Sequence, residues 1–145
     1  MVNRRDPEIE LPSGDYKARG PRILVVDDDA SLVHMLQENL ELEGYQVACG
    51  FDGQMAVQLA KLWRPDLIIL DLQMPLTNGL KAFHYIRAMP ETQTLPVIFL
   101  TGGQAAELTP VVTKSYRVAH LKKPVDLAHL NVMIRHFLQQ YPVPH

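Results

Sequence analysis

Short apolar runs that end in polar residues constrain this chain more than any other feature. Ile23–Val26 leads directly into Asp27–Asp29, and Leu67–Leu70 leads into Asp71. Brief runs of β-branched and other apolar residues are typical of strands buried on both faces in a parallel sheet. Both runs are far too short to cross a membrane. We therefore expect a buried sheet whose strands end in carboxylates.

The rest of the chain alternates between such runs and helical periodicity. Strands are predicted over 22–27, 45–50, 66–70, 96–100 and 119–122, and helices over 30–43, 54–63, 78–88 and 126–140. Pro110 suits the first turn of one more short helix, over about 110–117. Strands that alternate with helices form βαβ crossovers. We therefore expect an α/β fold, a doubly wound five-stranded parallel sheet with helices on both faces and a short or irregular fourth helix.

Apolar positions on these helices make up the candidate core. They recur with helical spacing and would face the sheet. The candidates are Leu32, Val33, Met35, Leu36, Leu40, Val57, Leu59, Ala60, Trp63, Leu80, Phe83, Tyr85, Ile86, Leu127, Leu130, Met133, Ile134, Phe137 and Leu138. Cys49, on a predicted strand, is expected to be a buried and unreactive thiol.

Composition excludes several classes of protein. The 145 residues carry a net charge of −2 and contain no Lys/Arg-rich run, so we expect no direct nucleic-acid binding. The single cysteine excludes an internal disulfide and a cysteine-based zinc site. The first residues lack the apolar core of a secretory signal. These observations favour a cytoplasmic protein that does not bind membranes.

The domain organisation is predicted to be simple. Residues 1–20 mix charged residues with Pro7, Pro12 and Gly14, a pattern typical of an N-terminal extension. Residues 21–141 have the length of one domain. Residues 142–145 would then be a short C-terminal tail.

Polar side chains follow four of the predicted strands. Asp27–Asp29 follow the first strand, Asp71 the third, Thr101 the fourth and Lys123 the fifth. The carboxyl ends of parallel strands share one edge of the sheet, where ligands bind. Clustered carboxylates repel one another unless a cation neutralises them, and hard oxygen ligands suit Mg²⁺. A carboxylate at this edge could accept a phosphoryl group, whose oxygens the lysine and the hydroxyl would contact.

Each of these residues also has an ordinary structural role when it is taken singly. Asp28 or Asp29 could cap the following helix, Thr101 could be a strand-end hydroxyl, and Lys123 could be solvated. Their predicted convergence at one edge favours a site.

The ordered set of motifs resembles the receiver domain of response regulators from bacterial two-component systems. The resemblance covers about residues 22–140 and implies a flavodoxin-like sheet of order 2-1-3-4-5. The matching pieces are Ile23–Asp29, Leu67–Pro75, Asn78-Gly79, Phe99–Thr101 and Lys122–Pro124.

The resemblance implies roles for the acidic cluster and one neighbour. Asp71 would be the phosphoacceptor and a ligand of the metal. Asp28 would bind Mg²⁺ (or Mn²⁺) directly, and Asp27 would help through a water molecule. The backbone carbonyl of Gln73 would complete the protein ligands.

Four further positions receive roles from the same resemblance. Lys123 would pair with the phosphoryl group, and its bond to Pro124 would be cis. Thr101 would be the switch hydroxyl that moves toward the phosphate. His120 occupies the place of the switch aromatic residue, where the family usually has Tyr or Phe.

Such a domain would be a signalling switch rather than an enzyme with a substrate of its own. It would receive a phosphoryl group from a sensor histidine kinase or a phosphotransfer protein. Its changed surface would then act on a downstream protein target or form a homodimer. Gln73 and Gly103 are expected to influence the rate of dephosphorylation. We expect either a stand-alone receiver or a piece of a longer regulator, because no output domain fits in the remainder.

The sequence departs from the family pattern after Thr101. Gly102 stands where a small residue such as Ala or Ser is usual, and Tyr116-Arg117 stand where a Gly-Ala pair is usual. Because of these changes, the resemblance does not predict which surface the fourth and fifth helices form in this chain.

Two alternatives stay open on the sequence. A haloacid-dehalogenase-like phosphatase would use Asp27 as nucleophile, with Asp29 and Thr101 completing its first motifs. That family needs an acidic pair after the lysine, and only Asp126 follows Lys123. The other alternative is a phosphorylation-independent interaction module on the same fold.

Overall fold

A computed structural model describes residues 20–74, 78–102 and 117–140 of the chain. No helix within these ranges is long and apolar enough to cross a bilayer. In chain order the elements are β1 (Arg22–Val26), α1 (Ala30–Leu42), β2 (Gln46–Gly50), α2 (Gly53–Trp63), β3 (Leu67–Asp71), α3 (Gly79–Ala88), β4 (Val97–Thr101), β5 (Val118–Lys122) and α5 (Leu127–Gln140).

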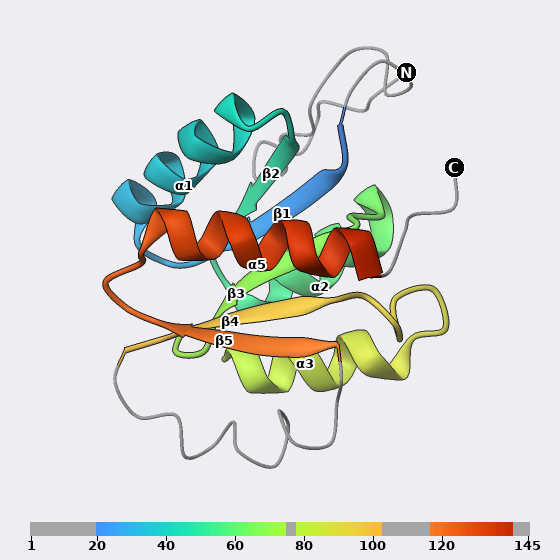
Figure 1. Cartoon of the computed structure of the whole chain (residues 1–145). Coiled ribbons are helices and arrows are strands. Elements are labelled where there is room, and N and C mark those ends of the chain that lie inside the picture. Colours follow the sequence, from blue (N-terminus) through green and yellow to red (C-terminus); the bar gives the residue numbers. More distant parts are fainter. Residues whose placement is uncertain (1–19, 75–77, 103–116, 141–145) are drawn as a thin grey trace, which may run out of the picture.

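The strands form one parallel sheet in the order β2-β1-β3-β4-β5. Helices α1 and α5 cover one face of this sheet, and α2 and α3 cover the other (Figure 1). The predicted architecture and strand order are therefore confirmed, and each observed boundary lies within one residue of its prediction. The helix predicted over about 110–117 falls outside the described residues, except for Arg117, which lies in a turn.

The core consists of two clusters, one on each face of the sheet. Alternate residues of β1 point to opposite sides: Leu24 and Val26 pack with α2 and α3, whereas Ile23 and Val25 pack with α1 and α5. Strands covered on both faces have no solvent-facing positions, so they appear in the sequence as continuous apolar runs.

Several predictions about the core are wrong or only partly right. Met35 is 41% exposed and Tyr85 is 52% exposed, because each lies at the margin of its helix's apolar stripe. Cys49 is half-buried rather than buried, since β2 is an edge strand. Six more candidates are only partly buried against the core: Leu32, Val57, Leu80, Leu127, Met133 and Leu138.

Polar caps start three helices soon after the strands that precede them. Asp29, Asp52 and Asn78 cap α1, α2 and α3, and each accepts a hydrogen bond from the backbone N–H three residues further on. These caps satisfy N–H groups that have no partner within the helix. They also bring the helix N-termini to the edge of the sheet where the strands end.

Arg64 supplies a test of local backbone strain. This residue caps the C-terminus of α2 in the left-handed region, with φ 57° and ψ 62°. Left-handed backbone costs a residue with a Cβ atom about 1 kcal/mol, whereas glycine adopts it freely. We expect Arg64→Gly to raise the free energy of unfolding by about 0.5–1 kcal/mol, as measured by urea denaturation. Lys61→Gly, inside the same helix, should lower it by about 1 kcal/mol. A loss of stability in Arg64→Gly would contradict the assignment of strain.

Candidate functional site

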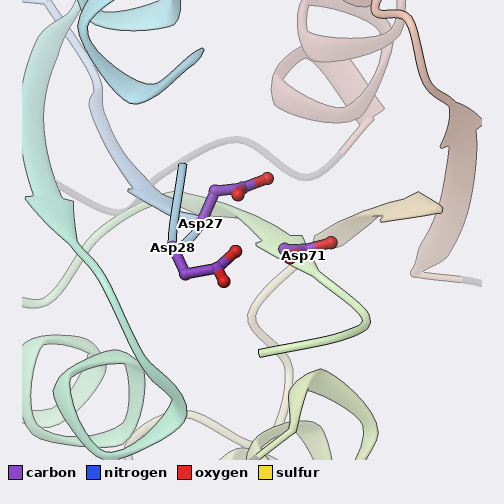
Figure 2. Close-up of side chains that lie close together, drawn as sticks. All are labelled: Asp27, Asp28 and Asp71. Carbon is purple, nitrogen blue, oxygen red and sulfur yellow. The ribbon is translucent and has the colours of Figure 1, made fainter. Parts of the chain in front are cut away.

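Three aspartates meet at the carboxyl edge of the sheet. Asp27 and Asp28 directly follow β1, and Asp71 is the last residue of the neighbouring strand β3 (Figure 2). One carboxylate oxygen from each lies within 4.8 Å of the others. Asp27 and Asp71 are buried, with 0% and 3% exposure, and Asp28 is exposed. The cluster therefore combines two desolvated carboxylates with one that faces solvent.

Lys123 brings a positive charge between the two buried carboxylates. Its Nζ lies 2.9 Å from Oδ2 of Asp27 and 3.3 Å from Oδ1 of Asp71. Its backbone N–H donates to the carbonyl of Thr101 (2.8 Å), which ties the lysine to the end of β4. The Lys123–Pro124 peptide bond is cis, the isomer that the resemblance implies.

The backbone around β1 holds Asp27 in place. Its Oδ1 accepts the N–H of Asp29 (2.9 Å), and its own N–H donates to the carbonyl of Gly50 at the end of β2 (3.2 Å). One carboxylate oxygen is thus used by the start of α1, and the other faces Lys123. Asp29 itself is the helix cap, so one of the ordinary roles considered for the aspartates applies to it.

The environment shifts the ionisation of Asp71 and Lys123. Burial and the negative charge of Asp27 raise the pKa of Asp71 to about 6, against the attraction of Lys123 and a hydrogen bond from the backbone of Gln73. Burial acts to lower the pKa of Lys123, but its hydrogen bond to Asp27 and the charge of Asp71 outweigh this effect and raise it. The lysine therefore stays protonated, and one ammonium group only partly offsets two buried carboxylates.

The other predicted site residues lie at different distances from this cluster. Thr101 ends β4, is 1% exposed and pairs in register with Lys122, so it lies at the same edge. His120 pairs with Phe99 further back along β5, and its side chain is exposed. Gln73 is exposed and follows Asp71 by two residues. Gly103 falls outside the described residues.

The sequence did not predict one close contact to the end of β3. Gly79, the first residue of α3, packs so tightly against the backbone of Asp71 and Leu72 that a side chain would overlap it. Its N–H donates to the carbonyl of Leu72 (2.9 Å). The signal that could have revealed it is a glycine at the start of a helix, where glycine is otherwise a poor helix former.

The donor set fits a divalent cation. Carboxylate oxygens are hard ligands, and three of them within 4.8 Å of one another match the chemistry of Mg²⁺ or a similar ion. Burial and the nearby charge of Asp27 both act against the ionised form of Asp71, and a bound cation would favour that form. The Asp27, Asp28 and Asp71 cluster could therefore hold a metal ion.

Comparison with known proteins decides the family. The family model that describes the response regulator receiver domain matches residues 23–135 of this chain. The chain belongs to this family. Its sheet order is the one that the resemblance implies, and the match decides against the haloacid-dehalogenase-like alternative. The response regulators for which this family is named are signalling proteins.

Curated relatives include several bacterial regulators. The transcriptional regulatory protein PrrA of Mycobacterium tuberculosis is 32% identical over 126 residues, or 87% of this chain and 53% of the relative. The regulatory protein AtoC of Escherichia coli is 33% identical over 118 residues, or 81% of this chain and 25% of the relative. The chain thus spans about half the length of PrrA and a quarter of AtoC.

Solved structures agree with the sequence comparison. The receiver domain of a signal transduction histidine kinase from Syntrophus aciditrophicus has a TM-score of 0.74 and 30% identity, covering 87% of this chain and 96% of that one. The receiver domain of a sensor histidine kinase from Pseudomonas aeruginosa, with a magnesium ion coordinated in its active site cleft, has a TM-score of 0.73 and 28% identity. That match covers 83% of this chain and 98% of that one.

The raised pKa of Asp71 predicts a stabilising substitution in metal-free protein. A carboxyl group whose pKa is higher in the folded state binds more protons there, so its ionisation destabilises the fold as the pH rises from about 4 to above 6. We expect Asp71→Asn to raise the free energy of unfolding in EDTA at pH 7 by roughly 1–3 kcal/mol. The gain should shrink as the pH falls toward 4.

Urea denaturation across this pH range checks the prediction, and Asp126→Asn is the matched control. Asp126 is an exposed residue whose side chain accepts a hydrogen bond from the N–H of His129, a role that asparagine can also fill. The control should therefore show little change. A loss of stability in Asp71→Asn at pH 7 would contradict the charge imbalance.

Proposed function

We propose that this chain is a phosphorylation-dependent switch in which Asp71 accepts a phosphoryl group from a phosphohistidine. The donor would be a sensor histidine kinase or a phosphotransfer protein. The observation that carries the proposal is the position of Lys123, whose ammonium group lies 2.9 Å from Asp27 and 3.3 Å from Asp71 beside a third carboxylate. A nucleophilic carboxylate, a fixed cation and a set of metal ligands are the parts that phosphoryl transfer needs.

The metal would be Mg²⁺ (or Mn²⁺). Asp28 and Asp71 would hold it together with the backbone carbonyl of Gln73, and Asp27 would contribute through water. When bound, the ion supplies positive charge that offsets both the clustered carboxylates and the transferring phosphoryl group.

In the proposed reaction, a carboxylate oxygen of Asp71 attacks the phosphorus atom of the phosphohistidine. The new O–P bond forms as the P–N bond breaks, and the electron pair returns to the histidine nitrogen. Asp71 must be ionised to attack, and a pKa of about 6 leaves it mostly ionised at neutral pH. Lys123 would pair with the phosphoryl oxygens, and the Thr101 hydroxyl would move toward them.

Phosphorylation would then change the contacts of the carboxyl edge and the surface beyond it. The negative phosphoryl group biases a pre-existing equilibrium between two conformations. The backbone hydrogen bond from Lys123 to Thr101 links both phosphoryl-contacting residues, and His120 would respond as the switch aromatic position. Gln73 and Gly103 would tune the rate of dephosphorylation.

The proposal extends to the context of the domain. Residues 21–141 would form the receiver unit, with residues 1–20 and 142–145 outside it. The domain would act in the cytoplasm on a downstream protein target, with a homodimer as one form of output. It would bind neither nucleic acid nor membranes through this region.

Phosphorylation by acetyl phosphate tests the acceptor. Incubation with Mg²⁺ and acetyl phosphate should add one phosphoryl group to the wild-type chain and to Asp126→Asn, as measured by intact-mass spectrometry. Asp71→Asn should gain none, because an amide oxygen is too weak a nucleophile. Labelling that survives Asp71→Asn but disappears in Asp27→Asn would contradict the assignment of the acceptor. Failure of the wild-type chain to bind Mg²⁺ and to become labelled would favour a phosphorylation-independent module.

A further inference from the structure

Gly79 lies against the backbone of the acceptor strand at a distance that excludes any side chain. A Cβ atom on Gly79 would overlap the carbonyl oxygen of Asp71 and would lie 2.8 Å from Cα of Leu72. Both neighbours are backbone atoms, so no side-chain rotation can relieve the overlap. A Cβ atom at Gly102 would meet nothing within 4 Å. Close packing, rather than helix propensity, therefore requires glycine at position 79.

Hydrogen bonds and side-chain packing hold the peptide between Asp71 and Leu72 in its position beside Gly79. The N–H of Leu72 donates to the carbonyl of Leu100 (3.0 Å) and extends the pairing with β4. The carbonyl of Leu72 accepts the N–H of Gly79 (2.9 Å), and the Leu72 side chain is buried in the cluster that includes α3. A methyl group at position 79 would strain or break at least one of these contacts.

The acceptor carboxylate depends directly on this peptide. Asp71 is its first residue, and the backbone of Gln73, one residue beyond Leu72, hydrogen-bonds to the Asp71 carboxylate. The Nζ atom of Lys123, which follows β5 at the same edge of the sheet, lies 3.3 Å from Oδ1 of Asp71. A shift of the Asp71–Leu72 peptide would therefore change how Asp71 meets both Gln73 and Lys123.

We propose that Gly79 is a positioning residue for phosphoryl transfer to Asp71, an inference that rests on the proposed function. Because Gly79 has no side chain, the start of α3 packs directly on the Asp71–Leu72 peptide, which is hydrogen-bonded to β4 on its other side. The carboxylate is then held where the lysine and the metal ligands converge. Misplacement of a reacting group by about 1 Å is enough to slow a reaction by orders of magnitude.

The test compares Gly79→Ala with a variant of equal stability. Leu40 is fully buried on the opposite face of the sheet, in the cluster with α1 and α5. Leu40→Val or Leu40→Ala, whichever matches the loss of unfolding free energy in Gly79→Ala, serves as the control. The measurements are the rate of labelling by acetyl phosphate at saturating Mg²⁺ and the Mg²⁺ concentration that gives half the maximal rate.

We expect Gly79→Ala to be labelled about tenfold or more slowly than the wild-type chain, with a higher Mg²⁺ requirement. The matched Leu40 variant should keep the wild-type rate. If Gly79→Ala is too unstable, both variants are made in the Arg64→Gly background and measured at low temperature, where circular dichroism verifies that they are folded. Equal rates in Gly79→Ala and the matched Leu40 variant would overturn the inference.

The failure of this inference differs from the failure of the proposed function. A wild-type chain that is labelled at Asp71, together with a Gly79→Ala variant as fast as its control, overturns only the role of Gly79. A wild-type chain that is not labelled at Asp71 overturns the proposed function and the inference with it.

Discussion

The burial of two carboxylates beside one ammonium group is the interaction on which the site depends. Asp27 and Asp71 are almost fully removed from solvent, and among the described residues Lys123 is the cation that contacts both. Burial, followed by the negative charge of Asp27, raises the pKa of Asp71 to about 6 in spite of the attraction of Lys123. The apolar clusters on both faces of the sheet supply the stability that lets the fold tolerate this imbalance. The site therefore favours any ligand that adds positive charge.

The same arrangement connects the carboxyl edge to the rest of the fold. Asp71 and Thr101 end neighbouring strands, and Lys123 follows the next one. Lys123 directly follows β5, and its backbone N–H donates to the carbonyl of Thr101, the last residue of β4. A change in the charge near the Lys123 side chain therefore acts on a residue that is linked to both strands. Gly79, at the start of α3, lies directly against the backbone of Asp71 and Leu72. In the proposed switch, a chemical change at one carboxylate thus reaches several elements through direct contacts.

Much of the fold could be predicted from the sequence because its signals are local. Buried parallel strands appear as apolar runs, and the apolar spacing of the helices places their starts within one residue of the observed positions. The order of the strands depends on long-range pairing, and only the resemblance to receiver domains supplied it. Met35 and Tyr85 were misassigned because helical spacing alone does not say where an apolar stripe ends.

The candidate site was predictable in membership but not in geometry. Asp27, Asp28 and Asp71 could be placed at one edge because strand ends meet there. The two contacts of Lys123 and the close approach of Gly79 depend on tertiary packing, which no local pattern records. The resemblance assigned His120 to the switch aromatic position from its place in the sequence. Its exposed side chain lies back from the cluster, so that role stays a proposal.

Direct titration of the Asp71 carboxyl group tests the central claim, that the site carries too little positive charge until a cation binds. Carbon-detected NMR of the side-chain carboxyl, followed across pH in EDTA and again in excess Mg²⁺, reports its ionisation residue by residue. The account predicts a pKa of about 6 without metal and a clearly lower pKa with Mg²⁺. A metal-free pKa at the ordinary aspartate value of about 3.9, unchanged by Mg²⁺, would contradict it.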